Sequence, residues 1–236
     1  DNFPRMQAAL LEAAAANGAK FIAAENLYLY GDPGGQPLRE DLPYNAHTKK
    51  GKVRKEMTEA VFAAHRTGKV RAAAVRGSNF FGPDDLVYAR LVFHPALTGK
   101  SVNVLGSLNY PHTFTYAPDF GRALAIVGTR DEALGQAWHV PSEPPLTQAQ
   151  FVKLLSEELS RPVKPQVGTP ILVRALGLFN PMIGEMNEMM YEWTKPFVMD
   201  SSKFERAFGM KATPFRQQIR ETLAWVKANP PVNGSH

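Results

Sequence analysis

Short apolar segments alternate with longer amphipathic segments along the first part of this 236-residue chain. Residues 20–25 (KFIAAE) and 70–75 (VRAAAV) are almost continuously apolar, as in strands that are buried on both faces. Helical patterns over residues 4–17 and 47–67 precede these strands, and each pattern is followed by a glycine. Strands that alternate with helices of this length are typical of a parallel sheet covered by helices. We therefore expect an α/β fold.

The second half of the chain departs from this regular alternation. A Thr-x-x-Gln capping box at Thr147 and Gln150 predicts the start of a helix there. A Met- and Phe-rich helical stretch over residues 171–193 belongs either to the core or to the wall of an apolar pocket. The other expected helices are 86–97, 120–127, 201–208 and 214–227, and the expected strands are 101–105, 112–116 and 137–140.

Composition excludes several classes of site. The chain has no cysteine, so disulfides and thiolate metal sites are excluded, and a reducing, cytoplasmic location is expected. The net charge of +5 is spread along the chain, so no nucleic-acid partner is expected. No apolar run reaches the ~20 residues of a membrane helix, and no membrane partner is expected. The histidines at 65, 94 and 139 are isolated, so no metal site is expected.

Landmark residues follow the two predicted strands in a fixed order. Within residues 21–83 the chain reads FIAAENLYLYGD, REDLPY, HTKKGKVRKEMTEA and VRAAAVRGSNFFGP. Their order and spacing resemble the extended short-chain dehydrogenases/reductases, the family of NAD-dependent epimerases and dehydratases. FTYAPDFGRAL, DSSKFERAFGM and ETLAWVK continue the resemblance toward the end of the chain. The matching positions in the first part are Tyr30, Gly31, Glu40, Pro43, Lys52, Glu56, Arg76, Gly82 and Pro83.

The resemblance implies a Rossmann-type parallel sheet with a smaller C-terminal α+β substrate lobe. Residues 1–83 would be the remainder of the dinucleotide-binding domain, and residues 84–236 mainly the lobe, with 112–141 returning to the Rossmann core. The sequence contains no G-x-x-G-x-x-G turn between a strand and a helix. We therefore expect that the N-terminal strands of the fold are missing and that this chain alone is inactive and does not bind NAD(P) tightly.

The Tyr-x-x-x-Lys motif of the family is altered. In that motif the lysine shares a helix face with the tyrosine, lowers the pKa of the phenol and can reach the nicotinamide ribose. Here Thr48 stands four residues before Lys52, and Asn26 occupies the position of the catalytic serine. A threonine hydroxyl titrates far above the tyrosine reference of ~10, so Lys52 cannot make Thr48 an efficient base. The resemblance implies that Lys52 orients the ribose and that Asn26 and Thr48 polarise the reacting oxygen.

Three nearby residues are alternative proton donors. They are Tyr28, Tyr44 and His47. Each also has a structural explanation, because tyrosines are often packing aromatics and His47 opens a helix, where an exposed side chain is common. The sequence leaves these alternatives open.

Further site residues follow from the resemblance. Ser78 is expected to bind the cofactor, and Asn79, Tyr28 and Tyr116 are expected to line the substrate site. His112 is also expected there, where nucleotide-sugar epimerases have an arginine that holds the diphosphate. Loss of that bidentate arginine makes a nucleotide sugar less expected as substrate.

These features predict an NAD(P)-dependent epimerase, dehydratase or reductase, acting on a small organic substrate of carbonyl or sugar-like type, in the complete protein. The alternative is a non-catalytic sensor or scaffold that binds NAD(P) with the same fold. The sequence does not decide between NAD and NADP. By resemblance, two copies would pair through the helix over residues 47–67.

Overall fold

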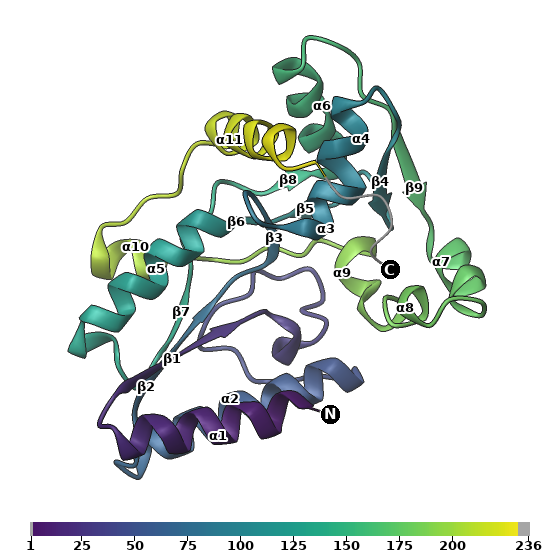
Figure 1. Cartoon of the computed structure of the whole chain (residues 1–236). Helices are drawn as coiled ribbons and strands as arrows, with labels where there is room; N and C mark the ends of the chain where they lie inside the picture. The colour runs from purple at the N-terminus through teal and green to yellow at the C-terminus, as the bar shows by residue number, and fades with distance from the viewer. Residues whose placement is uncertain (1, 231–236) are drawn as a thin grey trace.

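In a computed structural model, which describes residues 2–230, a parallel three-stranded sheet lies between helices in one half of the protein (Figure 1). The strand order is β1-β2-β7, and both pairs are parallel, with Glu25 opposite Arg76 and Arg76 opposite His139. This confirms the predicted α/β fold. Within the described residues β1 pairs only with β2, so it lies at the edge of the sheet. The strands are β1 (Lys20–Glu25), β2 (Arg71–Arg76) and β7 (Ala137–His139).

Helices pack on both faces of this sheet. Ala72 of β2 packs in one cluster with Val61 of α2, whereas Val75 packs in another with Ala123 of α5. Because successive side chains of a strand point to opposite faces, β2 is buried on both sides, which explains its uniformly apolar sequence. The helices are α1 (Asn2–Ala16), α2 (Lys49–Arg66) and α5 (Ala117–Thr129).

A third hydrophobic cluster lies in the lobe. Its centre is aromatic, and the rings of Phe114 and Phe151 stack at 4.7 Å between centroids. Helix α6 begins at the predicted capping box of Thr147 and Gln150. The strands outside the central sheet are β3 (Asn79–Phe81), β4 (Val102–Leu105), β5 (Pro111–His112), β6 (Phe114–Tyr116), β8 (Leu146–Thr147) and β9 (Pro165–Gly168). The helical segments near them are α3 (Leu86–Tyr88), η2 (Ala89–Phe93), α4 (His94–Leu97), α6 (Gln148–Glu158) and α11 (Phe215–Ala228).

The predicted Met- and Phe-rich helix over residues 171–193 is broken into short pieces. Proline at 181 interrupts the backbone hydrogen bonding. Gly177 and Gly184 lie so close that a Cβ on Gly177 would come within 2.8 Å of the Cα of Gly184, which lets the chain fold back on itself. The pieces are α7 (Pro170–Gly177), α8 (Pro181–Gly184), η4 (Asn187–Met189) and α9 (Tyr191–Thr194). The remaining segments are η1 (Tyr28–Tyr30), η3 (Asp131–Ala133) and α10 (Ser202–Phe208).

Two other predicted elements are also divided. The expected helix over 86–97 contains a π-helical segment, η2, between two short α-helices. The expected strand over 112–116 splits into β5 and β6, because Thr113 bonds instead to the segment at 197–199. That segment packs on the central sheet with Phe204 and Met210, although it lies within the predicted lobe. The proposed boundary at residue 84 stays a prediction, and residues 231–236 lie outside the described part.

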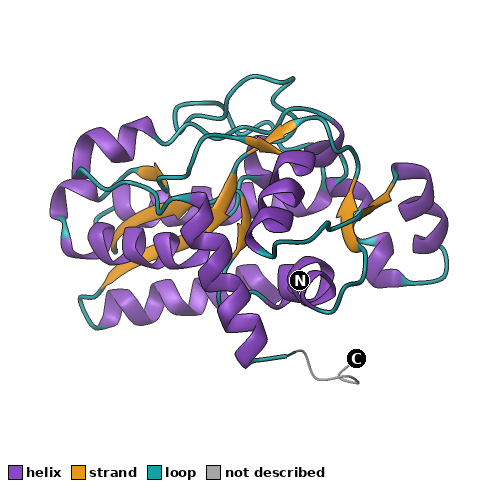
Figure 2. Ribbon diagram, turned by 90° about the horizontal axis from the view of Figure 1, so that it is seen from above, coloured by secondary structure: helices purple, strands orange, loops and turns teal. Residues whose placement is uncertain are grey.

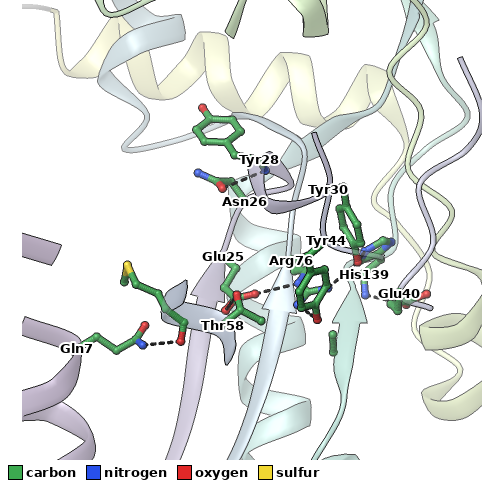
Figure 3. Close-up of polar contacts among 12 residues, drawn as sticks. Gln7, Glu25, Asn26, Tyr28, Tyr30, Glu40, Tyr44, Thr58, Arg76 and His139 are labelled. Atoms are coloured by element: carbon green, nitrogen blue, oxygen red, sulfur yellow. Dashed lines mark hydrogen bonds and ion pairs between the residues drawn. The ribbon is translucent and has the colours of Figure 1, made fainter. Parts of the chain in front are cut away.

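A buried arginine joins β1 to β2 (Figure 3). Arg76 is fully buried, and its Nε donates to Glu25 Oε2 at 2.8 Å. Its two terminal nitrogens donate to the hydroxyls of Tyr30 and Tyr44, at 2.5 and 2.8 Å. The other carboxylate oxygen of Glu25 accepts a hydrogen bond from Thr58 of α2 at 2.7 Å. This arrangement satisfies a charge pair that would otherwise be costly to bury.

The same network reaches β7 through a neutral histidine. Burial, followed by the charge of Arg76, lowers the pKa of His139 to about 3. Its Nδ1 faces the carbonyl of Asp200 at 3.0 Å and therefore carries the proton, so Nε2 accepts from Tyr30 at 2.9 Å. The backbone N–H of His139 donates to Glu40. The family landmarks at 30, 40 and 76 thus form one structural network.

We expect Arg76→Met to lower the free energy of unfolding by about 3–5 kcal/mol, because it leaves Glu25 buried without its cation. Urea denaturation would measure the loss. Arg39→Met is the control, since Arg39 is exposed and pairs only with exposed Asp41, and a change within about 0.5 kcal/mol is expected. A loss below 1 kcal/mol in Arg76→Met would contradict this account of the network.

Candidate active site

A cavity of about 740 Å³ lies at the carboxyl ends of β1 and β2. Ligands of open parallel sheets bind at this end of the strands. One wall comes from the segments after β1 and β2 and from the first turns of α2, and the other from the lobe. The wall residues used below are Asn26, Tyr28, Lys49, Lys50, Val53, Arg54, Asn79, Phe80, Asp85, Tyr88, Leu91, Glu185, Met186, Glu188, Met189, Glu192 and Trp193.

The structure brings three of the predicted site residues together. Asn26, Tyr28 and Asn79 all line the cavity. Figure 3 shows Asn26 and Tyr28 at the end of β1, beyond the Arg76 network. Asn26 Oδ1 accepts a hydrogen bond from the backbone N–H of Tyr28 at 3.3 Å, which leaves the Nδ2 donors available for a ligand oxygen.

Tyr28 is held as a neutral phenol. Burial, followed by the charge that Glu192 carries at high pH, raises the pKa of Tyr28 to about 12. A phenol with this pKa is a weak acid and its oxygen is not a base near neutral pH, but its O–H can donate a hydrogen bond. Tyr28 therefore suits the polarisation of a ligand oxygen better than the removal of a proton.

Asn79 is positioned by a buried histidine. Burial lowers the pKa of His112 to about 4, so its ring is neutral near pH 7. Asn79 Nδ2 donates to His112 Nδ1 at 3.1 Å, which places the ring proton on Nε2. The ring also stacks on Trp193, with 4.4 Å between centroids. His112 thus supports two wall residues and does not itself line the cavity.

Thr48 and Lys52 are not placed at the cavity as the resemblance implied. Thr48 is the buried N-cap of α2, and its Oγ1 accepts from the N–H of Gly51 at 3.0 Å and donates to Met189 Sδ. Lys52 is exposed. Helical residues two positions apart do not share a face, so a helix that turns Lys50 toward the cavity directs Lys52 elsewhere.

The lysine that lines the cavity is neutralised by lobe carboxylates. Lys50 pairs with Glu185 and, at 2.7 Å, with Glu188. The other oxygen of Glu188 accepts from the backbone N–H of Lys49, so a carboxylate already occupies the N-terminus of α2. These contacts bind the lobe to α2 across the cavity.

Two further predicted residues, Ser78 and Tyr116, do not line the cavity. Ser78 is buried at the end of β2, and its Oγ has no hydrogen-bond partner among the described residues. Tyr116 packs in the lobe core and donates its hydroxyl proton to Glu221 of α11. Of the alternative proton donors, Tyr44 belongs to the Arg76 network, and His47 packs edge-on against Tyr191 at 4.8 Å.

The sequence reasoning missed Glu192. This residue lines the cavity and is only 2% exposed, and burial raises its pKa to about 8. Its signal in the sequence is a carboxylate flanked by Tyr191 and Trp193, the last of three glutamates in the Met- and Phe-rich stretch. Of that stretch, Met186 and Met189 do line the cavity, whereas Leu178 and Phe179 are exposed.

Neither a metal centre nor a membrane helix is found in the described part of the chain. Residues 2–230 contain no group of three His, Asp or Glu side chains placed to hold a metal ion. No helix among them is both long and apolar enough to cross a bilayer.

Comparisons with known proteins identify the same family that the landmarks resemble. Residues 3–140 match the model of the NAD dependent epimerase/dehydratase family. No curated protein sequence matches the chain.

Several solved structures share the fold. The dTDP-glucose 4,6-dehydratase of Bacillus anthracis, in complex with NAD, is 16% identical with a TM-score of 0.74. The UDP-glucuronic acid 4-epimerase of Bacillus cereus is 15% identical with a TM-score of 0.70, and the UDP-glucose 4-epimerase of Thermus thermophilus is 15% identical with a TM-score of 0.73, both with NAD. The matches cover 95%, 93% and 94% of this chain, which spans 67%, 65% and 68% of theirs.

Because Thr48 caps α2, we expect Thr48→Ala to lower the free energy of unfolding by about 1 kcal/mol. Thr48→Ser keeps the accepting oxygen and should unfold as the wild type does. Chemical denaturation of the two variants tests the cap. Unchanged stability in Thr48→Ala would show that the hydroxyl is not needed for the helix and would return it to the candidates for ligand binding.

Proposed function

Because the chain belongs to the NAD-dependent epimerase/dehydratase family, we propose that it forms the substrate side of an NAD(P)-dependent epimerase, dehydratase or reductase. The observation that carries the proposal is the cavity at the carboxyl ends of β1 and β2, with Asn26, Tyr28 and Asn79 on its wall. These side chains offer hydrogen bonds to one ligand without a charge of their own.

The proposed substrate is a small organic carbonyl compound or alcohol. Phe80, Tyr88, Leu91 and Trp193 give the cavity an apolar wall. The position that holds a diphosphate-binding arginine in nucleotide-sugar epimerases is the buried, neutral His112. The carboxylates of Glu185 and Glu188 already neutralise Lys50, so this lysine is not available to bind a phosphate. These features support an uncharged substrate over a nucleotide sugar.

The residues of this chain fit only the nicotinamide end of the cofactor, either NAD or NADP. The unpartnered, buried hydroxyl of Ser78 at the end of β2 would face the nicotinamide side. The cofactor would exchange a hydride with a carbon of the substrate. A glycine-rich turn for the pyrophosphate is not found in residues 2–230, and the free edge of β1 could accept a further strand. We therefore propose that tight NAD(P) binding needs the third of the fold that the related structures have in addition.

In the proposed chemistry, Asn26 and Tyr28 stabilise charge on the substrate oxygen. Asn26 offers its amide donors and Tyr28 its phenol, while Asn79 is held in place by His112. Donors that are already oriented strengthen as the oxygen becomes negative. The proposal gives no substrate contact to Thr48 or Lys52, because neither lines the cavity.

A second candidate is a non-catalytic NAD(P)-binding sensor or scaffold. The observation that favours it is the absence, from the described cavity wall, of the tyrosine–lysine pair that transfers the proton in this family. Turnover separates the two candidates, because a sensor binds NAD(P) without converting carbonyl compounds or alcohols.

The cysteine-free composition supports a cytoplasmic location, which we propose for the complete protein. Disulfides are rare in that compartment, although proteins elsewhere can also lack cysteine. Fractionation of cells that produce the protein would decide the point.

We expect Asn26→Ala to lower kcat/KM about 10²-fold in the complete protein with NAD(P), because one oriented donor to the oxygen is lost. A panel of small ketones, aldehydes and alcohols would be assayed. Asn17→Ala is the control, since Asn17 is exposed at the end of α1 and bonds only to a local carbonyl. Unchanged turnover in Asn26→Ala would contradict the assigned role, and no turnover by the wild type would favour the sensor.

We also propose a homodimer through α2 and its neighbour α1, which contact each other. Phe3, Met6 and Leu10 follow helical spacing on α1 and are 58%, 57% and 55% exposed. An apolar stripe of this kind is typical of an interface.

The doubly substituted variant Met6→Glu/Leu10→Glu should therefore be monomeric, whereas the wild type should show twice the mass of one chain in light scattering. Leu178→Glu, at a residue that is 81% exposed on a different segment, is the matched control and should stay dimeric. A monomeric wild type would exclude the proposed dimer.

A further inference from the structure

Glu192 is a buried carboxyl group at the wall of the cavity. The residue is 2% exposed, and its Oε1 has no hydrogen-bond partner among the described residues. An unpaired polar atom inside a protein costs free energy, and titratable groups with strongly shifted pKa values are concentrated at functional sites. The Arg76 network and the lobe core do not use this group.

The two aromatic neighbours of Glu192 prevent it from turning to the solvent. Tyr191 packs edge-on against Phe197 at 6.1 Å and against His47. Trp193 stacks on His112, and its carbonyl accepts a hydrogen bond from the N–H of Ser107 at 2.9 Å.

The backbone at Gly106 also lies close to the backbone of Trp193. A Cβ on Gly106 would lie 2.3 Å from the carbonyl oxygen of Trp193, so the contact requires a glycine. Helix α9 is therefore fixed with the carboxyl group directed away from bulk water.

No cation within the described residues is paired with Glu192. Lys50 is engaged by Glu185 and Glu188, and Arg54 lies over the ring of Phe3 at 4.9 Å. The neighbours that influence the carboxyl group electrostatically are Tyr28, Tyr88 and Tyr191, none of which is a cation. The hydroxyl of Tyr191 lowers the pKa of Glu192, but by less than burial raises it. A buried carboxyl group without a cation holds its proton.

We propose that Glu192 is a neutral carboxylic acid that donates a hydrogen bond to the carbonyl or hydroxyl oxygen of a small, uncharged ligand in the cavity. The ligand class follows from the wall, where Phe80, Leu91 and Trp193 would contact an apolar body. The inference rests on the proposed function only for the identification of this ligand with the substrate.

The carboxyl group of Glu192 can donate a hydrogen bond only over a defined pH range. Because burial raises the pKa of Glu192 to about 8, the donor is present below pH 8 and is lost as the pH rises through that value. The phenols of Tyr28, Tyr88 and Tyr191 have raised pKa values, and the pKa of His112 is lowered to about 4. The charged groups on the cavity wall are Lys49, Lys50, Arg54, Asp85, Glu185 and Glu188.

The test measures binding of acetophenone and 1-phenylethanol by calorimetry between pH 6 and pH 9.5, without cofactor. Wild-type affinity for acetophenone, which can only accept, should be constant up to about pH 7.5 and then fall by up to tenfold for each further pH unit. Affinity for 1-phenylethanol should fall less, because its hydroxyl can donate to the ionised carboxylate. Glu192→Gln keeps a donor that cannot ionise, so its affinity at pH 6 should be near that of the wild type and should not change with pH. The comparison of these two proteins removes the contribution of every other titratable group.

Glu192→Met removes the donor and should bind about tenfold more weakly at pH 6, the size of one hydrogen bond. Exchange of an unpaired buried carboxyl for an apolar side chain of similar length is tolerated by a fold, and thermal unfolding would verify this. Glu12→Gln, on the exposed side of α1, should behave as the wild type. As a measurement independent of any ligand, infrared difference spectra should show a protonated carboxyl band at pH 6 that Glu192→Gln lacks.

Three results would overturn the inference. They are equal affinity of wild type and Glu192→Met at pH 6, a wild-type affinity for acetophenone that is unchanged through pH 8, and binding of neither probe by the wild type. Because no cofactor is present, these outcomes are separate from turnover. A protein that binds the probes as expected but converts no substrate with NAD(P) would refute the proposed function and leave the role of Glu192 intact.

Discussion

A fully buried guanidinium must find acceptors on every side, and the satisfaction of Arg76 organises the first half of this protein. Its partners come from β1, from η1 and the segment that follows it and, through Tyr30 and His139, from β7. These segments are far apart in the sequence, and one cation holds them in register. The candidate site begins at Asn26, one residue after Glu25 at the end of β1. The position of the site therefore depends on the ion pair between Glu25 and Arg76.

The α/β fold and the sheet could be predicted from the sequence, because buried parallel strands are apolar over their whole length. The order of the landmarks indicated the family, but it could not say that Tyr30, Glu40 and Arg76 serve the scaffold. Nor could spacing alone reveal that the hydroxyl of Thr48 is used by the first turn of α2, which turns Lys50 and not Lys52 to the cavity. Such assignments depend on where a helix begins.

Glu192 was beyond prediction for a different physical reason. Residues 171–193 have a helical pattern, but the close approach of Gly177 and Gly184 and the stacking of Trp193 on His112 bend them into short turns. Only contacts between distant segments bring this carboxyl group to the cavity that Asn26 and Asn79 also line. The cavity therefore joins two kinds of residue, those placed by local strand ends and those placed by tertiary packing.

The contact between Asn79 and His112 depends on the protonation state of the histidine. It forms in its present arrangement only while Nδ1 of the imidazole has a free lone pair, because the amide of Asn79 supplies the proton. Protonation of the ring would set two donors against each other, and the amide of Asn79 would have to turn its oxygen toward the ring. With a pKa of about 4, the ring stays unprotonated through the neutral range, so the contact keeps its present arrangement there and changes only in acid. Burial of this histidine thus gives the wall a shape that does not vary across the pH interval in which Glu192 changes its charge.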